Sequence, residues 1–428
     1  MENLLKMTSD ELAVAKKEME AAYAECKAKN LNLDMTRGKP CSQQLDHVTG
    51  ILEALSADDY KAENGTDCRN YGILSGIPEA KALFAGVLGT TADRVIVGNG
   101  SSLNLMYDTV VRAILYGEVD SEKPWSQEPV KKWLCPVPGY DRHFGVTQSL
   151  GFELIPVPMT ENGPDMEIVE RFVAEDAAIK GMWCVPLYSN PDGIVYSAET
   201  CTRLAAMKTA AKDFRIYWDN AYVVHHLYED KKGSIPDILA LCEAAGNPNR
   251  VYEFASTSKV TLAGSGISCI AANPANAAHA EKNMSVQTIG PDKINELRHV
   301  RYFQGANSIE NVMKRHADII RPKFEMTVSI LDKQLKSASF ARWNNPMGGY
   351  FVSLFVYPGT AKRVVSMAKE IGVAFTPAGA TYPCGFDPKD ENIRIAPTFP
   401  AIGDVEQAVD VLCVCAKLAA VEKRLTEV

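Results

Sequence analysis

Between about residues 46 and 300, short apolar runs alternate with segments of helical periodicity. A strand followed by a helix and then by another strand of the same sheet forms a right-handed crossover between parallel strands. The alternation therefore predicts a mostly parallel sheet with helices on its faces. The expected strands are Val95–Val97, Trp133–Cys135, Leu154–Pro156, Met182–Val185, Ile216–Trp218 and Val251–Phe254, and the expected helices include Leu103–Tyr116, Glu199–Lys212 and Pro236–Ala245.

The pattern changes after about residue 300, where a smaller α+β unit is expected. It should contain a helix at about Ser308–Ser337, a strand at Tyr350–Phe355 and helices at Ala361–Ile371 and about Val405–Leu425. At the other end, Thr8 and Glu11 have the spacing of a capping box, which predicts a helix up to about Asn30. A chain of 428 residues is long enough for two domains. We expect an N-terminal helix and arm at 1–45, a large domain at 46–305 and a small C-terminal domain at 306–428, with the N-terminal segment packed on the small domain.

Charge and composition exclude several classes of partner. Lys and Arg number 45 against 53 Asp and Glu, a net charge of −8 without a basic run. We therefore expect neither nucleic acid nor an anionic membrane as the main partner. No segment approaches the roughly 20 apolar residues that cross a bilayer, and the N-terminus lacks the pattern of a secretory signal. The 11 cysteines contain no C-x-x-C pair, which favours reduced thiols in the cytoplasm, and seven dispersed histidines predict no metal site.

The segment Arg94–Met106 predicts a place where an anion binds. An apolar strand ends at Val97, a turn of small residues follows, and a helix begins near Ser102. A helix N-terminus presents free N–H groups and the positive end of the helix dipole, which suit a phosphate. An ordinary strand-to-helix turn gives the same pattern. The spacing matches neither the G-x-G-x-x-G fingerprint nor a P-loop, so dinucleotides and nucleoside triphosphates are disfavoured.

Two further strand ends carry ionisable side chains. The apolar run Arg215–Trp218 leads into Asp219, and Tyr222 follows three residues later. A carboxylate at the carboxyl end of a strand lies where open α/β folds bind ligands, although an aspartate there also caps a following helix. The run Val251–Phe254 leads into Ser256, Ser258 and Lys259. A shielded lysine is a suitable nucleophile for an aldehyde because desolvation lowers its pKa, whereas a surface lysine in a Ser/Thr loop is the alternative.

Together and in this order, these motifs resemble the pyridoxal 5'-phosphate (PLP)-dependent aminotransferases of fold type I. The segment LNLDMTRGKP at residues 31–40 points to the subgroup I-c aspartate aminotransferases. The resemblance runs from about residue 31 to the C-terminus. It implies an α/β fold like that of aspartate aminotransferase. In that fold a large domain carries a mostly parallel, seven-stranded sheet between helices, and a smaller α+β domain follows.

The resemblance assigns the chemistry of the cofactor to four residues. Lys259 is similar to the lysine that forms the Schiff base with PLP and shuttles the proton during the reaction. Asp219 is similar to the carboxylate that pairs with the pyridine nitrogen and keeps it protonated. Tyr222 and Asn190 are similar to donors that bind the phenolic oxygen of the cofactor. Asn190 precedes Pro191, so a cis peptide bond is plausible here, although Ser-Asn-Pro-Asp-Gly is by composition a surface turn.

Other positions match the binding of the cofactor ring and phosphate. Tyr140 is similar to the aromatic residue that stacks on the pyridine ring. Tyr71 is similar to a tyrosine that reaches the phosphate from the second subunit, which implies a homodimer with shared active sites. The residues similar to the phosphate cup are Gly100, Ser101, Ser102, Ser256 and Ser258. Many relatives also place an arginine a few residues after the lysine, and here that stretch has no cation. Another cation, or the helix dipole with the hydroxyl groups, must then suffice.

The substrate is expected to bind through arginine and the N-terminal arm. Arg394, in Asn392-Ile-Arg-Ile-Ala, is similar to the arginine that grips the substrate carboxylate with two parallel hydrogen bonds. Gly38 is similar to the glycine of the mobile arm. Arg37 and Lys39 flank it and are our hypothesis for the residues that bind a second carboxylate. A solvated strand arginine and a solvated basic pair are the alternatives.

The resemblance implies a ping-pong transfer of an amino group through Lys259, from an amino acid, with aspartate favoured, to a 2-oxo acid, with 2-oxoglutarate favoured. Because one fold supports several reactions, an aromatic aminotransferase, a β-lyase and a decarboxylase remain alternatives. A PLP-binding regulatory protein is a more distant alternative. Such regulators need an N-terminal DNA-binding module, and only one helix precedes the arm here.

Overall fold

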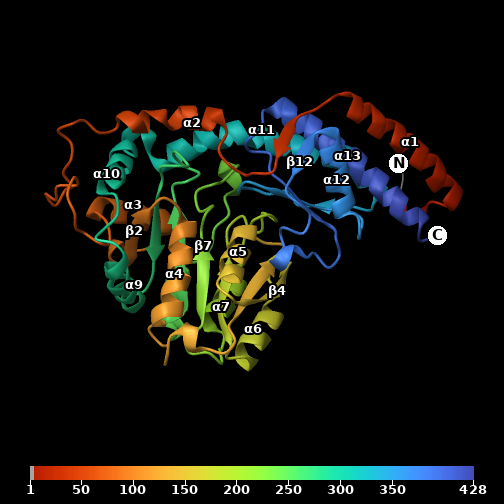
Figure 1. Ribbon diagram of the computed structural model, residues 1–428. Helices are drawn as coiled ribbons and strands as arrows, with labels where there is room; N and C mark the ends of the chain where they lie inside the picture. The colour runs from red at the N-terminus through yellow and green to blue at the C-terminus, as the bar shows by residue number, and fades with distance from the viewer. Residues whose placement is uncertain (1–3) are drawn as a thin grey trace.

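The computed structural model describes residues 4–428. An eight-stranded sheet lies at the centre of the larger part of the molecule (Figure 1), in the order β2-β9-β8-β7-β6-β3-β4-β5. From β8 to β4 neighbouring strands are parallel, whereas β9 is antiparallel to β8 and β2, and β5 to β4. The bounds are β2 Val95–Asn99, β3 Lys132–Val137, β4 Glu153–Thr160, β5 Gly163–Pro164, β6 Ile179–Cys184, β7 Arg215–Asp219, β8 Val251–Ser256 and β9 Ile267–Ala271. The mostly parallel sheet is confirmed, and β5 is a two-residue addition at its edge.

The sheet is buried on both faces, which explains its continuous apolar strands. Along β6, Met182 and Cys184 belong to one apolar core and Trp183 belongs to the core on the other face. Helices cover both faces: α3 Pro78–Leu88, α4 Ser102–Tyr116, α5 Asp141–Ser149, α6 Met166–Glu175, α7 Ala198–Ala206, α8 Ile238–Ala244, α9 Pro274–Gln287 and α10 Lys293–Tyr302. Successive side chains of a strand point to opposite faces of the sheet and so belong to two separate cores of an α/β sandwich.

The smaller part of the molecule surrounds a three-stranded antiparallel sheet in the order β10-β11-β13. The long helix α11 crosses above the large sheet, and α1 lies beside α13 (Figure 1). The arm adds β1, which pairs in parallel with β12. The N-terminal helix and arm therefore contact elements of the C-terminal region. The bounds are α1 Ser9–Ala28, β1 Leu33–Met35, α2 Ser42–Val48, α11 Ile309–Leu335, β10 Arg342–Trp343, β11 Val352–Phe355, α12 Ala361–Ile371, β12 Val373–Phe375, β13 Asn392–Ile395 and α13 Ile402–Leu425.

Local sequence placed some boundaries correctly and others wrongly. The capping box of Thr8 and Glu11 begins α1 as predicted. The helix predicted up to Lys212 ends instead at Ala206 as α7. Side chains distant in sequence bind its last carbonyl groups: Asn247 donates to Ala205 O and Arg250 donates to Met207 O. Tertiary contacts that local periodicity does not contain therefore end this helix. Among residues 4–428, no helix has the combination of length and apolar character needed to span a bilayer.

Candidate active site

The residues predicted to act on a cofactor follow strands whose carboxyl ends meet at one edge of the large sheet. Asp219 is the last residue of β7, and Lys259 lies three residues after β8. Gly100 follows β2, Tyr140 follows β3, and Asn190 lies beyond β6. Because these strands run in the same direction, the loops after them converge. This edge is where open α/β folds bind ligands.

Lys259 is half-buried in the turn after β8. Its Nζ lies 5.2 Å from the centroid of the Tyr222 ring, and the Tyr350 hydroxyl donates to its carbonyl oxygen at 3.3 Å. Burial lowers the pKa of the Lys259 amine, and the charge of Asp219 acts in the opposite direction. A lowered pKa increases the fraction of neutral amine at a given pH. The side chain is therefore suited to nucleophilic attack and to proton transfer.

Asp219 is a buried carboxylate with one oxygen engaged and one free. Its Oδ2 lies 2.9 Å from His143 Nε2, whereas its Oδ1 is buried without a partner. The His143 ring stacks on Trp183, with centroids 4.5 Å apart and planes at 15°. A buried unpaired carboxylate oxygen is costly unless a donor reaches it. The N–H of a protonated pyridine ring is such a donor, so this residue pair fits PLP.

Tyr140, Tyr222 and Asn190 lie close to that carboxylate or to Arg394. The Tyr140 ring is 4.9 Å from the His143 ring, and burial is the main cause that raises the pKa of Tyr140 to about 12. Burial also raises the pKa of Tyr222, so both phenols keep their protons near neutrality. The Asn190–Pro191 bond is cis, as the sequence suggested. A small cavity is lined by Tyr140, His143 and Asn190.

Two segments are predicted to hold a phosphate, and they contact each other. Ser258 Oγ donates to the carbonyl oxygen of Gly100 at 3.4 Å, which joins the turn after β2 to the turn after β8. Gly100 has a φ of 60°, a left-handed conformation that favours glycine. Ser101 precedes α4 and Ser102 begins it, and Ser256 ends β8. Asn104 N–H, in the first turn of the 15-residue helix α4, donates to Ser101 O, and the N–H groups of Ser102 and Leu103 before it have no acceptor inside the helix and suit an anion.

A cation lies near the turn after β8, although no cation occurs in the few residues that follow Lys259 in the sequence. Arg298, on α10, donates to Ser265 O at 3.3 Å and to Asn295 Oδ1 at 2.5 Å. Its Nε is buried without a partner, and within residues 4–428 it forms no ion pair with a carboxylate. Sequence reasoning missed Arg298 because it comes from a helix more than thirty positions beyond the lysine.

Arg394 lies on β13 and is 7% exposed. Its Nη1 binds Asp141 Oδ1 at 2.8 Å and Asn190 Oδ1 at 3.4 Å, and its Nη2 donates to Thr376 Oγ1 at 3.4 Å. Thr376 in turn donates to Thr36 O in the arm at 2.9 Å. The arm, Arg394 and the loop of Asn190 therefore form one connected network.

Gly38 lies where a side chain would disturb this network. A Cβ at this position would come within 2.4 Å of Phe351 Cζ. The Phe351 ring in turn packs under Arg394, with the guanidinium carbon 4.9 Å from the ring centroid. The glycine therefore permits a close approach of the arm to the aromatic ring that supports Arg394.

Replacing Gly38 with alanine is expected to lower kcat/KM by about tenfold, because displacing a positioning group by a fraction of an ångström is enough for such a loss. The protein should stay folded, with a loss of stability of about 1–3 kcal/mol from overpacking. Steady-state kinetics and thermal unfolding measure the two effects. Gly86→Ala is the control, since Gly86 lies inside α3 with open space at its Cβ. Equal kinetics for both variants would contradict a positioning role for Gly38.

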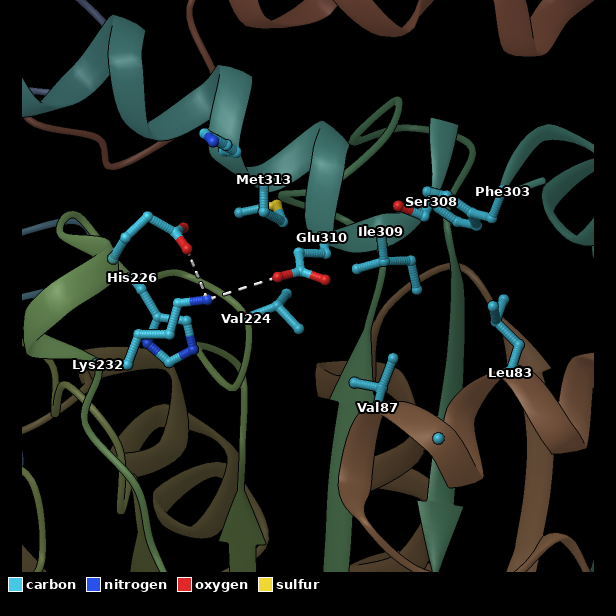
Figure 2. Close-up of a pocket in the computed structure, with 13 residues that line it drawn as sticks. Leu83, Val87, Val224, His226, Lys232, Phe303, Ser308, Ile309, Glu310 and Met313 are labelled. Atoms are coloured by element: carbon cyan, nitrogen blue, oxygen red, sulfur yellow. Dashed lines mark ion pairs between the residues drawn. The ribbon is translucent and has the colours of Figure 1, made fainter. Parts of the chain in front are cut away.

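Two predicted residues do not meet the others within the chain. Arg37 is exposed, and its side chain forms no hydrogen bond or ion pair with another residue of 4–428. Tyr71 is 81% exposed. A cavity of about 440 Å³ between α3, α11 and the loop after β7 is also separate from the site (Figure 2). There Lys232 Nζ lies 3.0 Å from Glu229 and 3.8 Å from Glu310, and apolar side chains such as Leu83 and Val87 also line the cavity. No residue predicted for the active site lines this cavity.

The fold and its carboxyl-edge site define an aminotransferase of fold type I, a class whose members depend on PLP. The sequence profile described as aspartate amino-transferase matches residues 7–427, and the chain belongs to this family. An aspartate aminotransferase of Corynebacterium glutamicum is 46% identical over 98% of this chain and 97% of its own length. A Mycolicibacterium smegmatis protein, provisionally named an aminotransferase, is 50% identical over 97% of both chains.

Solved structures agree. The crystal structure of a Corynebacterium glutamicum aspartate transaminase covers 98% of this chain and 99% of its own, with a TM-score of 0.96 and 46% identity. The α-aminoadipate aminotransferase LysN of Thermus thermophilus, solved with N-(5'-phosphopyridoxyl)-L-leucine, shares the fold alone, with a TM-score of 0.72, 20% identity, and coverage of 93% of this chain and 94% of its own. The chain is therefore an aminotransferase.

Proposed function

We propose that this aminotransferase uses PLP held by Lys259 to move the amino group of aspartate to 2-oxoglutarate. One observation carries the proposal: the desolvated amine of Lys259 and the free buried oxygen of Asp219 lie at the same sheet edge. The substrates are proposed from the relatives named aspartate aminotransferase and aspartate transaminase, which match along nearly the whole chain.

When bound, PLP supplies an electron-withdrawing ring that stabilises negative charge at the substrate Cα. Asp219 Oδ1 holds the proton on the ring nitrogen, and His143 fixes the orientation of Asp219 through Oδ2. Tyr140 would cover the ring, and the Tyr222 hydroxyl and the Asn190 amide would donate to its phenolic oxygen. Gly100, Ser101, Ser102, Ser256 and Ser258 would hold the phosphate, with Arg298 as the nearby cation.

The amine of Lys259 would take the proton from the substrate Cα and deliver it to C4′ of the cofactor, and it would carry a proton in the reverse direction in the other half-reaction. Arg394 binds the carboxylate of the amino acid and, afterwards, that of the 2-oxo acid, which fixes the Cα–H bond relative to Lys259. Both half-reactions use one site, so the kinetics should be ping-pong. Arg37 and Lys39 remain our hypothesis for the distal carboxylate of aspartate. Unchanged preference for aspartate over alanine in Arg37→Ala would contradict it.

Besides its substrates, we propose that the protein binds a second copy of its own chain. Tyr71, Tyr107, Val286, Ile289 and Ile294 are large apolar side chains that are at least one-third exposed. Their segments border a hollow of about 300 Å³ beside Gly100. Exposed apolar groups of this kind mark interaction surfaces. In a homodimer, Tyr71 would reach the phosphate site of the partner. Sedimentation that shows only a 46.8-kDa species would contradict this.

For the organisation of the chain, we propose the divisions 1–45, 46–305 and 306–428. The buried residues of the two cores of the large sheet all lie within 46–305, whereas the core of the small sheet combines residues of the N-terminal and C-terminal divisions with a few that follow β6 and β7. Limited proteolysis that cuts first inside either core would contradict these boundaries. The 11 unpaired cysteines, ten of them buried, support a reducing compartment such as the cytoplasm. Disulfide-bonded protein isolated from its native host would contradict that location.

Product analysis tests the reaction. With aspartate and 2-oxoglutarate, we expect oxaloacetate and glutamate in equal amounts. When one substrate is omitted, neither product should form in more than the amount of a single turnover. Release of ammonia would indicate a β-lyase, and release of carbon dioxide in step with aspartate loss would indicate a decarboxylase. Turnover of aromatic amino acids in preference to aspartate would retain the aminotransferase and reject the proposed donor.

A further inference from the structure

Arg394 already binds a carboxylate from its own chain. Its Nη1 lies 2.8 Å from Asp141 Oδ1, whereas its contacts with Asn190 and Thr376 are both 3.4 Å and involve uncharged groups. Its Nε is buried without a partner. Among residues 4–428, Asp141 is therefore the one side chain that neutralises this guanidinium by an ion pair.

The two members of the pair differ in how firmly they are held. Arg394 is 7% exposed, lies on β13 and packs over the Phe351 ring. Asp141 is 34% exposed and is the first residue of α5. A carboxylate in the first turn of a helix is stabilised by the helix dipole and by water, so Asp141 stays favourably placed without Arg394. The arginine is therefore the more buried and more closely packed member of the pair, and the aspartate is the more solvent-exposed one.

An incoming substrate competes for the same group. A guanidinium binds a carboxylate best through two parallel N–H groups. Asp141 occupies Nη1, and the other parallel pair would need Nε, which is buried. A second carboxylate beside Asp141 would also meet a like charge at short range, which is unfavourable. Binding and the resting ion pair are therefore alternatives.

We infer that Asp141 is an internal competitor of the substrate: it neutralises Arg394 while the site is empty and yields the guanidinium to the carboxylate of the amino or 2-oxo acid. The inference rests on the proposed role of Arg394. Asp141 follows β3 of the large sheet, and Arg394 belongs to the small sheet. The resting pair thus links the two sheets, and each substrate replaces that link. The competition raises the apparent Kd of the substrate, which equals the intrinsic Kd divided by the fraction of molecules in which Arg394 is free.

Removing the competitor should tighten binding. Succinate is the probe, because it has two carboxylates and neither an amino nor an oxo group that reacts. Calorimetry on the PLP-loaded protein should show a Kd about five- to tenfold lower in Asp141→Asn than in the unchanged protein, as for a charged contact that is partly exposed. Asp141→Ser, a second uncharged side chain suited to a helix start, should behave in the same way. Glu161→Gln, at the exposed turn after β4, makes the same change in charge and should alter Kd less than about twofold.

Arg394→Leu separates this inference from the proposed function. In that background, Asp141→Asn should no longer tighten succinate binding, since the two residues act through one contact. A Kd that is unchanged or raised in both Asp141 variants, while Arg394→Leu weakens binding, would overturn the role of Asp141 alone. Succinate binding that survives Arg394→Leu undiminished would overturn the proposed carboxylate site and this inference with it.

Discussion

Replacing Lys259 with alanine is expected to lower transamination by at least about 1,000-fold, because the variant loses both the nucleophile and the general base. The absorbance band of lysine-bound cofactor should be absent from purified Lys259→Ala, even after reconstitution with PLP.

Added small amines separate chemistry from folding in this variant. A primary amine such as methylamine can enter the space left by the Lys259 side chain and accept the proton from the substrate Cα. We expect it to restore part of the rate in proportion to its concentration. The melting temperature should stay near that of the unchanged protein, because a half-buried lysine without an ion pair contributes little to stability. Retention of more than a tenth of the activity by Lys259→Ala without amine would contradict the assignment.

Replacing Asp219 with asparagine should lower kcat by about 100-fold or more, because a nearby opposite charge is what keeps the ring nitrogen protonated. The amide has nearly the same shape and can still contact His143 Nε2, so the loss reports the charge. Steady-state kinetics and cofactor titration should show a fall in kcat that exceeds any loss of affinity for PLP.

His143 supplies the matched control for Asp219. It contacts Asp219 Oδ2 rather than the unpaired Oδ1, and it stacks on Trp183. His143→Gln keeps a donor near Oδ2 and should cost less than about tenfold, as expected for a residue that orients another. A larger loss in His143→Gln than in Asp219→Asn would contradict the proposed division of roles.

The sequence sufficed for six of the eight strands of the large sheet and for residues at strand ends. Lys259, Asp219 and the Gly100 turn each follow an apolar run, and parallel strands bring their carboxyl ends together, so order along the chain predicted their proximity. The antiparallel strand β9 was missed, because a short apolar run near glycines carries little periodic signal. The parallel pairing of β1 with β12 joins segments about 340 residues apart and has no local signature.

The remaining features depend on contacts between distant side chains. His143 lies 76 positions from Asp219, and Asp141 lies 253 positions from Arg394, so neither partner is evident from spacing. The segment Tyr140-Asp-Arg-His did place both residues beside Tyr140, the residue proposed to stack on the ring, and a charged side chain there was the one signal available. Arg37 was assigned to the substrate site because of its charge, but the sequence does not tell in which direction a side chain of the arm points. In the structure Arg37 is exposed.

The most direct test of PLP-dependent aspartate transamination is an absorbance spectrum of the purified protein under anaerobic conditions. The band of the lysine-bound cofactor should convert to that of pyridoxamine phosphate when aspartate is added, and return when 2-oxoglutarate follows. A cofactor band that aspartate leaves unchanged would contradict the proposed substrate. The absence of any cofactor band after reconstitution with PLP would contradict the central claim.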